Sequence, residues 1–199
     1  PPPPHFQRRR RHTRSCILSR GLGDVYKRQC KHLPWSSIHW YVGDERCYPV
    51  AHPERNDTMI AQQLWSRIET PMDNLHPIPA ELGPELAAEK YAALIHQIGR
   101  LDIVVLGIGE DGHTASLFPG NPALDNEQAV VPVYDAPKPP PQRVSLGLAT
   151  IRAAGQRIVL VSGSGKREAM ASIEQGIQLP VSRIGPARWF VDEAAAYNK

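Results

Sequence analysis

Short apolar runs rich in β-branched residues alternate with segments of helical periodicity along most of this sequence, and this alternation constrains the fold more than any other feature. Strands separated by helices favour parallel βαβ units, in which helices cover a sheet. We therefore expect an α/β domain with a doubly wound, mostly parallel sheet and helices on both faces. The expected strands are 38–42, 103–106, 144–148, 158–161 and 188–191, and the expected helices are 56–69, 84–99 and 166–174.

Three of these elements carry specific signals. Asn56 is a residue type that caps helix N-termini, and Pro84 suits the first turn of the second helix. The run 103–106 is continuously apolar, which is typical of a strand buried on both faces. In such sheets ligands bind at the carboxyl ends of the strands, so the segments that follow strands are the candidate sites.

Charge separates the first 34 residues from the rest. Residues 1–31 hold nine Lys/Arg and one Asp, whereas residues 32–199 hold 14 Lys/Arg and 19 Asp/Glu. We expect residues 1–34 to be a basic leader outside the domain, disordered or non-native, and residues 35–199 to form the domain. Because the domain itself is acidic, the overall isoelectric point of about 8.9 does not indicate a nucleic-acid partner.

Composition and cysteine content limit the class of protein. The 199 residues are 41% hydrophobic, as in a globular domain, and no apolar run approaches the roughly 20 residues that span a membrane. No segment has the pattern of a signal peptide, so we expect a cytoplasmic location without membrane association. Cys47 is the only cysteine of the domain, and no Cys/His pair has the spacing of metal ligands, so we expect no metal.

The segment 106–120 begins at the carboxyl end of an expected strand and contains the residues best suited to catalysis. Gly107, Gly109 and Gly112 match the dinucleotide-binding pattern G-x-G-x-x-G, but that pattern requires a full helix directly afterwards. Several Pro and Gly residues from position 119 onward leave room for only a turn or two, so we reject a dinucleotide site. The glycines do allow a tight path that places Asp111 and His113 in a crevice. Histidine is the natural general base near neutral pH, and a carboxylate can fix its tautomer.

A second charged segment, Asp44-Glu45-Arg46, follows the first expected strand and Gly43. Charges at a strand end are costly to bury without partners, so they belong either at a ligand crevice or in a solvated turn. From this segment alone the two interpretations are equally good. At a crevice, Arg46 would bind phosphate or a developing oxyanion.

Two further cations lie beside expected strands. Lys166 ends the loop Ser162–Lys166 between a strand and a helix, where backbone N–H groups suit an anion. The loop lacks the first glycine of a P-loop and has Arg167 where a Ser/Thr should bind magnesium, so ATP is not expected. An ordinary loop with a surface lysine remains an equal alternative. Arg143 follows a proline-rich loop at the start of another strand and is a second candidate phosphate contact.

Taken together and in this order, these segments resemble the 6-phosphogluconolactonase family, within the sugar-phosphate isomerase/deaminase-like superfamily. The matching segments are 40–46, 76–79, 106–120, 137–144 and 161–166, and the run 111–119 is the most specific. The resemblance implies a doubly wound, largely parallel sheet and the hydrolysis of 6-phospho-D-glucono-1,5-lactone to 6-phosphogluconate. This is an ester hydrolysis in the oxidative pentose phosphate pathway, and no cofactor is implied.

The resemblance also implies roles for seven residues. His113 would be the general base that activates water. Asp111 and Asp44 would orient the site as the other catalytic residues. The substrate and its phosphate would be bound by Arg46, Arg143, Lys166 and Gly109. The expected partner is a small sugar-phosphate lactone, and we expect a monomer.

The sequence departs from the family in one respect. Family members carry an N-terminal segment with a Gly-Gly-Ser/Thr phosphate loop, which residues 1–34 do not match. We therefore expect some apolar surface to be exposed, and an inactive sugar-phosphate-binding fragment is an alternative function. The other alternative is an amino-sugar-phosphate deaminase or isomerase. Deaminases have Phe-Asn-Glu-Pro after the histidine, whereas this chain has Ser116-Leu117-Phe118-Pro119, so the lactonase is favoured.

Overall fold

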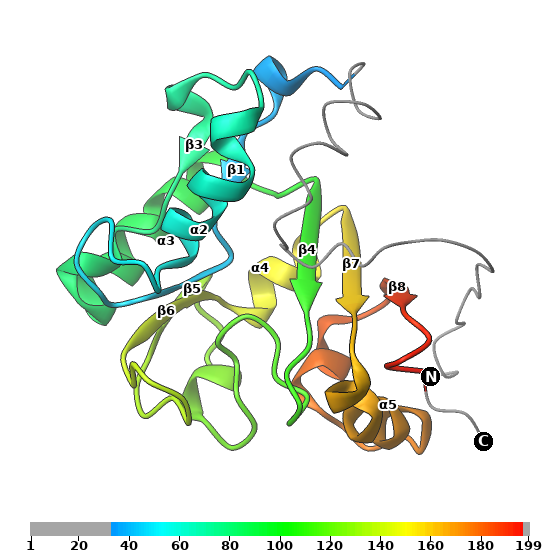
Figure 1. Cartoon of the computed structure of the whole chain (residues 1–199). Coiled ribbons are helices and arrows are strands. Elements are labelled where there is room, and N and C mark those ends of the chain that lie inside the picture. The colour runs from blue at the N-terminus through cyan, green and yellow to red at the C-terminus, as the bar shows by residue number, and fades with distance from the viewer. Residues whose placement is uncertain (1–32, 197–199) are drawn as a thin grey trace.

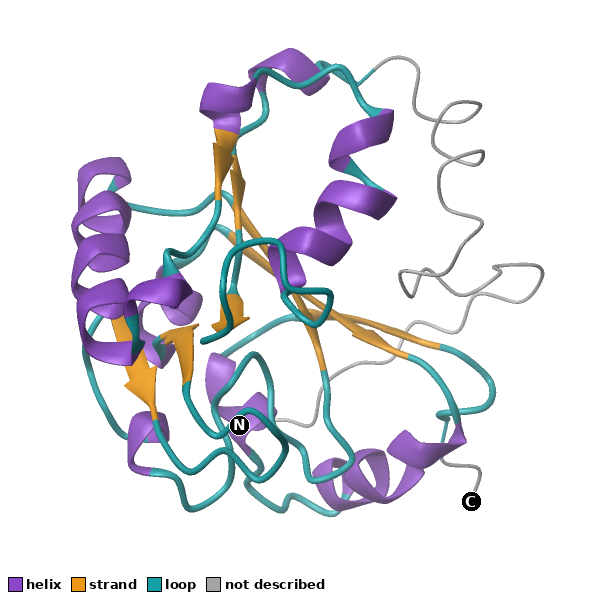
Figure 2. Ribbon diagram, turned by 60° about the vertical axis from the view of Figure 1, so that its left-hand side comes forward, coloured by secondary structure: helices purple, strands orange, loops and turns teal. Residues whose placement is uncertain are grey.

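The computed structural model describes residues 33–196, which form the mixed α/β arrangement shown in Figure 1. The strands are β1 (Trp40–Tyr41), β2 (Asp44–Arg46), β3 (Leu75–His76), β4 (Ile103–Gly107), β5 (Val130–Val133), β6 (Arg143–Leu146), β7 (Gln156–Val161) and β8 (Arg188–Val191). The α-helices are α2 (Asn56–Gln63), α3 (Pro84–Ile98), α4 (Leu148–Ala153) and α5 (Arg167–Glu174). In Figure 2 strands run through the middle of the molecule and most helices lie around them.

The strands pair in three small sheets, and most of the pairings are parallel. Strands β4, β7 and β8 form one parallel sheet, and β1 and β3 form a parallel pair. The third sheet, in the order β2-β6-β5, is antiparallel. The predicted α/β class with mostly parallel pairing is thus confirmed, although β6 belongs to an antiparallel sheet.

Helix α3 has the start that the sequence predicts, with Pro84 in its first turn. Its buried residues include Ala87, Ala88, Tyr91 and Ile95, and the helix packs on the antiparallel sheet that contains β5 and β6. The Tyr91 hydroxyl donates to the carbonyls of Val42 and His76, at 3.0 and 3.1 Å. Helix α3 therefore fixes the chain directly before β2, where the candidate site begins.

Strand β4 differs from the expectation that both of its faces are buried. Val104 and Leu106 are buried, but Ile103 and Val105 are 54% and 58% exposed. Phe190, on β8 of the same sheet, is 54% exposed. A continuous apolar run cannot show which face is covered, so the expectation for β4 was wrong, whereas the expected exposure of apolar surface is confirmed.

The segment from β2 to α2 also differs from its prediction. Of the two interpretations of Asp44-Glu45-Arg46, the structure excludes the solvated turn, because these residues form a strand whose partner is β6. Helix α2 ends at Gln63, and Asn56 is its first residue rather than its cap. The residue before it, Arg55, makes no capping hydrogen bond with its side chain, and the carboxylate of Glu45 accepts the N–H groups of Asn56 and Asp57 instead.

Strands β3 and β5 and helix α4 were not predicted. Pro132 lies inside β5, and proline disfavours a strand because it has no N–H to donate. The structure tolerates it because β5 is at the edge of its sheet. Within residues 33–196, no helix has the length and apolar character to cross a membrane.

Candidate active site

His113 lies in a tight loop that follows the carboxyl end of β4. The N–H of Gly109 donates to the carbonyl of His113 at 2.8 Å, and the N–H of Gly112 donates to the carbonyl of Gly109 at 3.1 Å. Gly112 has a φ of +80°, which side chains rarely adopt. After this loop the chain forms only a short 3-10 helix, Pro122–Leu124, so the local fold agrees with the rejection of a dinucleotide site.

The side chains of Asp111 and His113 are in direct contact. Asp111 Oδ1 lies 2.5 Å from His113 Nδ1 and accepts the His113 backbone N–H at 3.2 Å. Burial opposes the charge of Asp111, but hydrogen bonds from the ring and backbone of His113 outweigh it and lower the pKa of this carboxyl. The ring also packs against Phe118, with centroids 4.6 Å apart. The ionised carboxylate keeps the proton on Nδ1, which leaves the lone pair of Nε2 for a bound molecule.

A cavity of about 430 Å³ brings most of the predicted site residues together. Its lining includes Asp44, Arg46, Gly109, His113 and Arg143. Asp111 is not part of this lining and acts on the site through its contacts with the ring and the backbone N–H of His113. Residues of the strands β1, β2, β4 and β6, of helix α2 and of the histidine loop thus meet at one concave surface, which is large enough for a sugar phosphate.

Arg46 and Arg143 face each other across the antiparallel strands β2 and β6, where they are register partners. Neither forms an ion pair with any residue between 33 and 196. Arg143 is buried and donates to the carbonyls of Lys138 and Pro140, and burial together with the charge of Arg46 lowers its pKa. The charge of Asp44 offsets only part of this effect, so two adjacent guanidinium groups here favour an anion bound between them.

Asp44 is held by hydrogen bonds from two sides. Its Oδ2 accepts the hydroxyl of Ser116 at 2.7 Å, and its Oδ1 accepts the amide of Asn56 at 3.2 Å. The sequence did not identify Asn56, Ser116 or Tyr41 as site residues, although Asn56 and Tyr41 line the cavity. Only the helix-start signal pointed to Asn56, and nothing local pointed to Ser116, because its contact with Asp44 joins residues 72 positions apart.

Of the predicted binding residues, Lys166 alone does not line the cavity. In the described part of the chain, no contact joins its side chain to a residue of the lining. The loop before it is occupied by the chain's own carboxylate, since Asp192 accepts from the Ser162 hydroxyl and the Gly163 N–H. Burial would raise the pKa of Asp192, but these hydrogen bonds and one from Ala195 lower it. Two donors that suit an anion in this loop are therefore already satisfied, and the N–H of Lys166 donates to the carbonyl of Gly163.

We expect Asp192→Asn to lower the free energy of unfolding at neutral pH by an amount that shrinks in acid. Because the folded-state pKa of Asp192 is lowered, its stabilisation is present above the ordinary value of 3.8 and is lost as the pH falls through the lower folded value. Urea unfolding of both proteins at pH 7 and pH 3 measures this. A difference of the same size at both values would contradict it.

A second, more open groove of about 770 Å³ lies beside Arg152 and Arg183. Its lining holds no His, Cys, Asp or Glu, so it offers no general base or nucleophile of these types. Residues 33–196 also contain no group of three or more His, Cys, Asp or Glu side chains that could hold a metal ion. The chemistry of the described part is therefore concentrated at the cavity that His113 lines.

Comparison with known proteins gives consistent matches. The family model described as glucosamine-6-phosphate isomerases/6-phosphogluconolactonase matches residues 18–193. Rat 6-phosphogluconolactonase is 39% identical over 178 residues, which cover 82% of this chain and 69% of the rat protein. The family match starts upstream of the predicted domain boundary at residue 35. That boundary stays a prediction, because residues 18–32 lie outside the described part.

Solved structures share the fold. The crystal structure of 6-phosphogluconolactonase from Thermotoga maritima has a TM-score of 0.77 at 28% identity and covers 87% of this chain and 81% of its own. A monomeric glucosamine-6-phosphate deaminase has a TM-score of 0.75 at 20% identity, with 87% and 79% covered. The second likeness concerns the fold alone, since its identity is low.

Proposed function

Because the chain belongs to the glucosamine-6-phosphate isomerase/6-phosphogluconolactonase family, we propose that it hydrolyses 6-phospho-D-glucono-1,5-lactone to 6-phosphogluconate with His113 as the general base. The observation that carries the mechanism is that the Asp111–His113 pair adjoins a cavity that two unpaired arginines also line. Measuring acid release from the lactone, above the spontaneous rate, tests the activity.

The reaction follows from the placement of the imidazole. Nε2 of His113 takes a proton from a water molecule, whose oxygen attacks the lactone carbonyl carbon and gives a tetrahedral oxyanion. The oxyanion then collapses, the bond from that carbon to the ring oxygen breaks, and the imidazolium returns its proton to the ring oxygen. General-base help of this kind supplies roughly 10²–10⁴-fold, which suffices because a lactone is an activated ester.

The other residues have supporting roles in this proposal. Asp111 holds the tautomer and orientation of His113 and stabilises its charged form, as a carboxylate does behind a catalytic histidine. Arg46 and Arg143 bind the substrate phosphate or neutralise developing charge. Asp44 orients the cavity wall through Asn56 and Ser116. Because Gly109 has no side chain, the His113 ring can lie directly beside it.

We expect Arg46→Ala to raise KM by about 10–100-fold and to change kcat much less. A hydrogen bond to a charged group contributes roughly 1.5–3 kcal/mol, and a phosphate contact acts equally in the ground state and the transition state. Steady-state kinetics measure both constants. Arg188→Ala is the matched control, because it removes an exposed cation that does not line the cavity, and Lys166→Ala is measured beside it.

The role of Lys166 remains a prediction that the same kinetics decide. If Lys166→Ala raises KM as much as Arg46→Ala does, Lys166 reaches the substrate phosphate, and the present arrangement of its loop is not the one that binds substrate. A KM for Arg46→Ala equal to that of the wild type would instead remove Arg46 from the phosphate site.

The deaminase alternative has less support. Ser116, Leu117 and Phe118, where deaminases have a glutamate, are buried, and the Ser116 hydroxyl is bonded to Asp44. No carboxylate therefore stands at these positions to open a sugar ring. An assay of ammonia release from glucosamine 6-phosphate tests this alternative. A wild-type chain that binds 6-phosphogluconate but leaves the lactone at its spontaneous rate of hydrolysis would instead be the inactive binder.

A monomeric state, a cytoplasmic location and the lack of a nucleic-acid partner remain our predictions from the sequence. Size-exclusion chromatography with light scattering tests the first, and cell fractionation tests the second. The relatives do not decide the location, since one of them is an endoplasmic bifunctional protein from rabbit.

A further inference from the structure

Glu45 is a fully buried carboxylate that the proposed reaction does not use. It lies in β2 between Asp44 and Arg46, which both line the cavity. Because alternate side chains of a strand point to opposite faces, Glu45 points away from the cavity into the protein. A buried carboxylate is costly unless it is paired and hydrogen-bonded, so its partners indicate why it is there.

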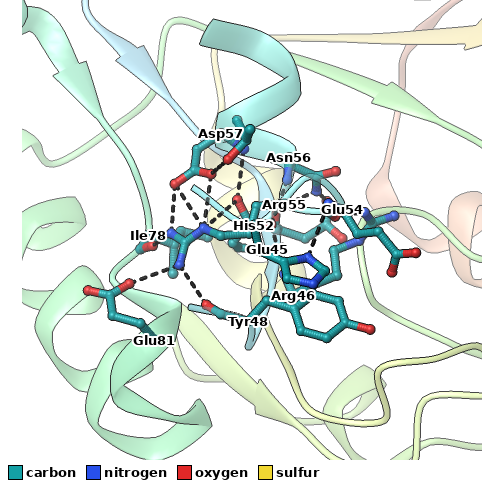
Figure 3. Close-up of polar contacts among 12 residues, drawn as sticks. Glu45, Arg46, Tyr48, His52, Glu54, Arg55, Asn56, Asp57, Ile78 and Glu81 are labelled. Atoms are coloured by element: carbon teal, nitrogen blue, oxygen red, sulfur yellow. Dashed lines mark hydrogen bonds and ion pairs between the residues drawn. The ribbon is translucent and has the colours of Figure 1, made fainter. Parts of the chain in front are cut away.

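The partners of Glu45 are backbone groups at the start of α2 and in its own strand. Oε1 accepts the N–H groups of Asn56 and Arg46 at 2.7 and 2.8 Å, and Oε2 accepts the N–H of Asp57 at 2.8 Å (Figure 3). The first N–H groups of a helix have no partner within the helix and favour a negative charge. One carboxylate thus ties β2 to the first turn of α2.

Arg55 is the counter-ion on the far side of Glu45, with only 2% of its surface exposed. It makes a bidentate contact with Asp57, donates to Glu81 at 2.9 Å and lies 3.9 Å from Glu45 (Figure 3). It also donates to the carbonyls of Tyr48 and Ile78 at 3.0 Å. Burial opposes its charge, but the hydrogen bonds to Asp57 and Glu81 outweigh it and raise the pKa of Arg55. Arg55 therefore stays charged and clamps three separate segments.

The two chain neighbours of Arg55, Glu54 and Asn56, each contact a residue of β2 that lines the cavity. The carbonyl of Glu54 accepts a hydrogen bond from Nη1 of Arg46 at 2.5 Å, and the amide of Asn56 donates to the carbonyl of Asp44 at 2.7 Å. None of these groups contacts His113 or Asp111, which lie in the loop after β4. A substitution that shifts this segment should therefore displace Arg46 in the cavity wall and leave His113 in place.

We propose that Glu45 and Arg55 are positioning residues, which hold Arg46 and Asn56 in the cavity wall and thereby set the affinity for the anionic end of the substrate. The proposal rests on the proposed function, because it assigns the phosphate to Arg46. It separates the site into two parts, a base held by Asp111 and an anion site held from behind by a buried ion pair. Neither Glu45 nor Arg55 touches the substrate in this scheme.

The test is Glu45→Gln, which keeps the shape of the side chain but replaces one acceptor oxygen by a donor that faces an N–H group. We expect KM for the lactone and Kd for 6-phosphogluconate, measured by calorimetry, to rise by roughly tenfold or more, because a charge-assisted contact is misplaced. We expect kcat to fall less than about threefold and the shape of its pH profile to stay unchanged, because proton transfer at His113 is untouched. Arg55→Met should give the same split, and Arg55→Lys should restore part of the affinity.

Arg183→Met is the matched control, because it removes the ion pair between Arg183 and Asp125, neither of which lines the cavity. A folded Glu45→Gln protein with wild-type KM and Kd, or one that loses kcat at unchanged KM, overturns the positioning role. If Glu45→Gln does not melt cooperatively, Arg55→Lys takes its place. Wild-type KM and Kd in that variant, or a loss of kcat at unchanged KM, then overturn the positioning role. A wild-type rate equal to the spontaneous one overturns the proposed function instead, and the Kd for 6-phosphogluconate still decides the positioning role.

Discussion

Replacing His113 by alanine is expected to lower kcat by at least about 100-fold, since general-base catalysis contributes roughly 10²–10⁴-fold. The imidazole is the nitrogen base of the cavity lining, and its Nδ1 is already engaged by Asp111 at 2.5 Å. KM should change little, because the phosphate contacts come from Arg46 and Arg143. Steady-state kinetics over a range of pH measure the loss of rate.

The fold should survive this change. The His113 side chain is 21% exposed and lies at the cavity rather than in the core, so truncation creates no closed void. We expect the free energy of unfolding to stay within about 1 kcal/mol of the wild type, as for changes outside well-packed cores. His96→Ala, at an exposed position near the end of α3, is the matched control and should keep the wild-type rate. Wild-type kcat in His113→Ala would exclude this residue as the base.

Gly109→Ala is expected to abolish nearly as much activity as His113→Ala, although it adds only a methyl group. A Cβ at Gly109 would lie 2.0 Å from Nδ1 of His113 and 2.6 Å from Oδ1 of Asp111, far inside contact distance. The ring is the mobile partner, so it must swing away and lose both Asp111 and its place at the cavity. A misplacement of about 1 Å at a catalytic group already costs about 10²-fold.

The fold of Gly109→Ala should again be close to native, because rotation of one partly exposed ring relieves the clash. Gly107→Ala is the matched control, since a Cβ there meets no heavy atom within 4 Å. We expect a much smaller loss of rate for it. The double variant Gly109→Ala/His113→Ala should be no slower than His113→Ala by itself, because both changes remove the same group. Additive losses would show that Gly109 acts on something other than the histidine.

The sequence predicted best those features that depend on residues close together in the chain. The bounds of β8 agree with the predicted strand 188–191, and α3 starts at Pro84 as expected. The histidine loop was equally accessible, because its glycines and the two-residue spacing of Asp111 and His113 define a contact that is local in the chain. The cavity lining includes Asp44, Arg46, Gly109, His113 and Arg143, so the structure brings these five predicted residues together.

The remaining features depend on contacts between distant residues. The loop Ser162–Lys166 looks the same in sequence whether it binds an external anion or the carboxylate of Asp192, which is 29 positions away from Gly163. The charges of Asp44–Arg46 left a ligand crevice and a solvated turn equally good, and only the pairing with β6 and the cavity lining decide between them. The sequence likewise indicated no buried role for Glu45 or Arg55, because only their contacts with distant residues show that both are buried.

A crystal structure of the chain with 6-phosphogluconate bound tests the central claim most directly. We expect the carboxylate of the product, which derives from the lactone carbonyl, within about 3.5 Å of Nε2 of His113, and the phosphate between Arg46 and Arg143. A product carboxylate remote from His113, with this ring in contact with no part of the ligand, would contradict the assignment of His113 as the base.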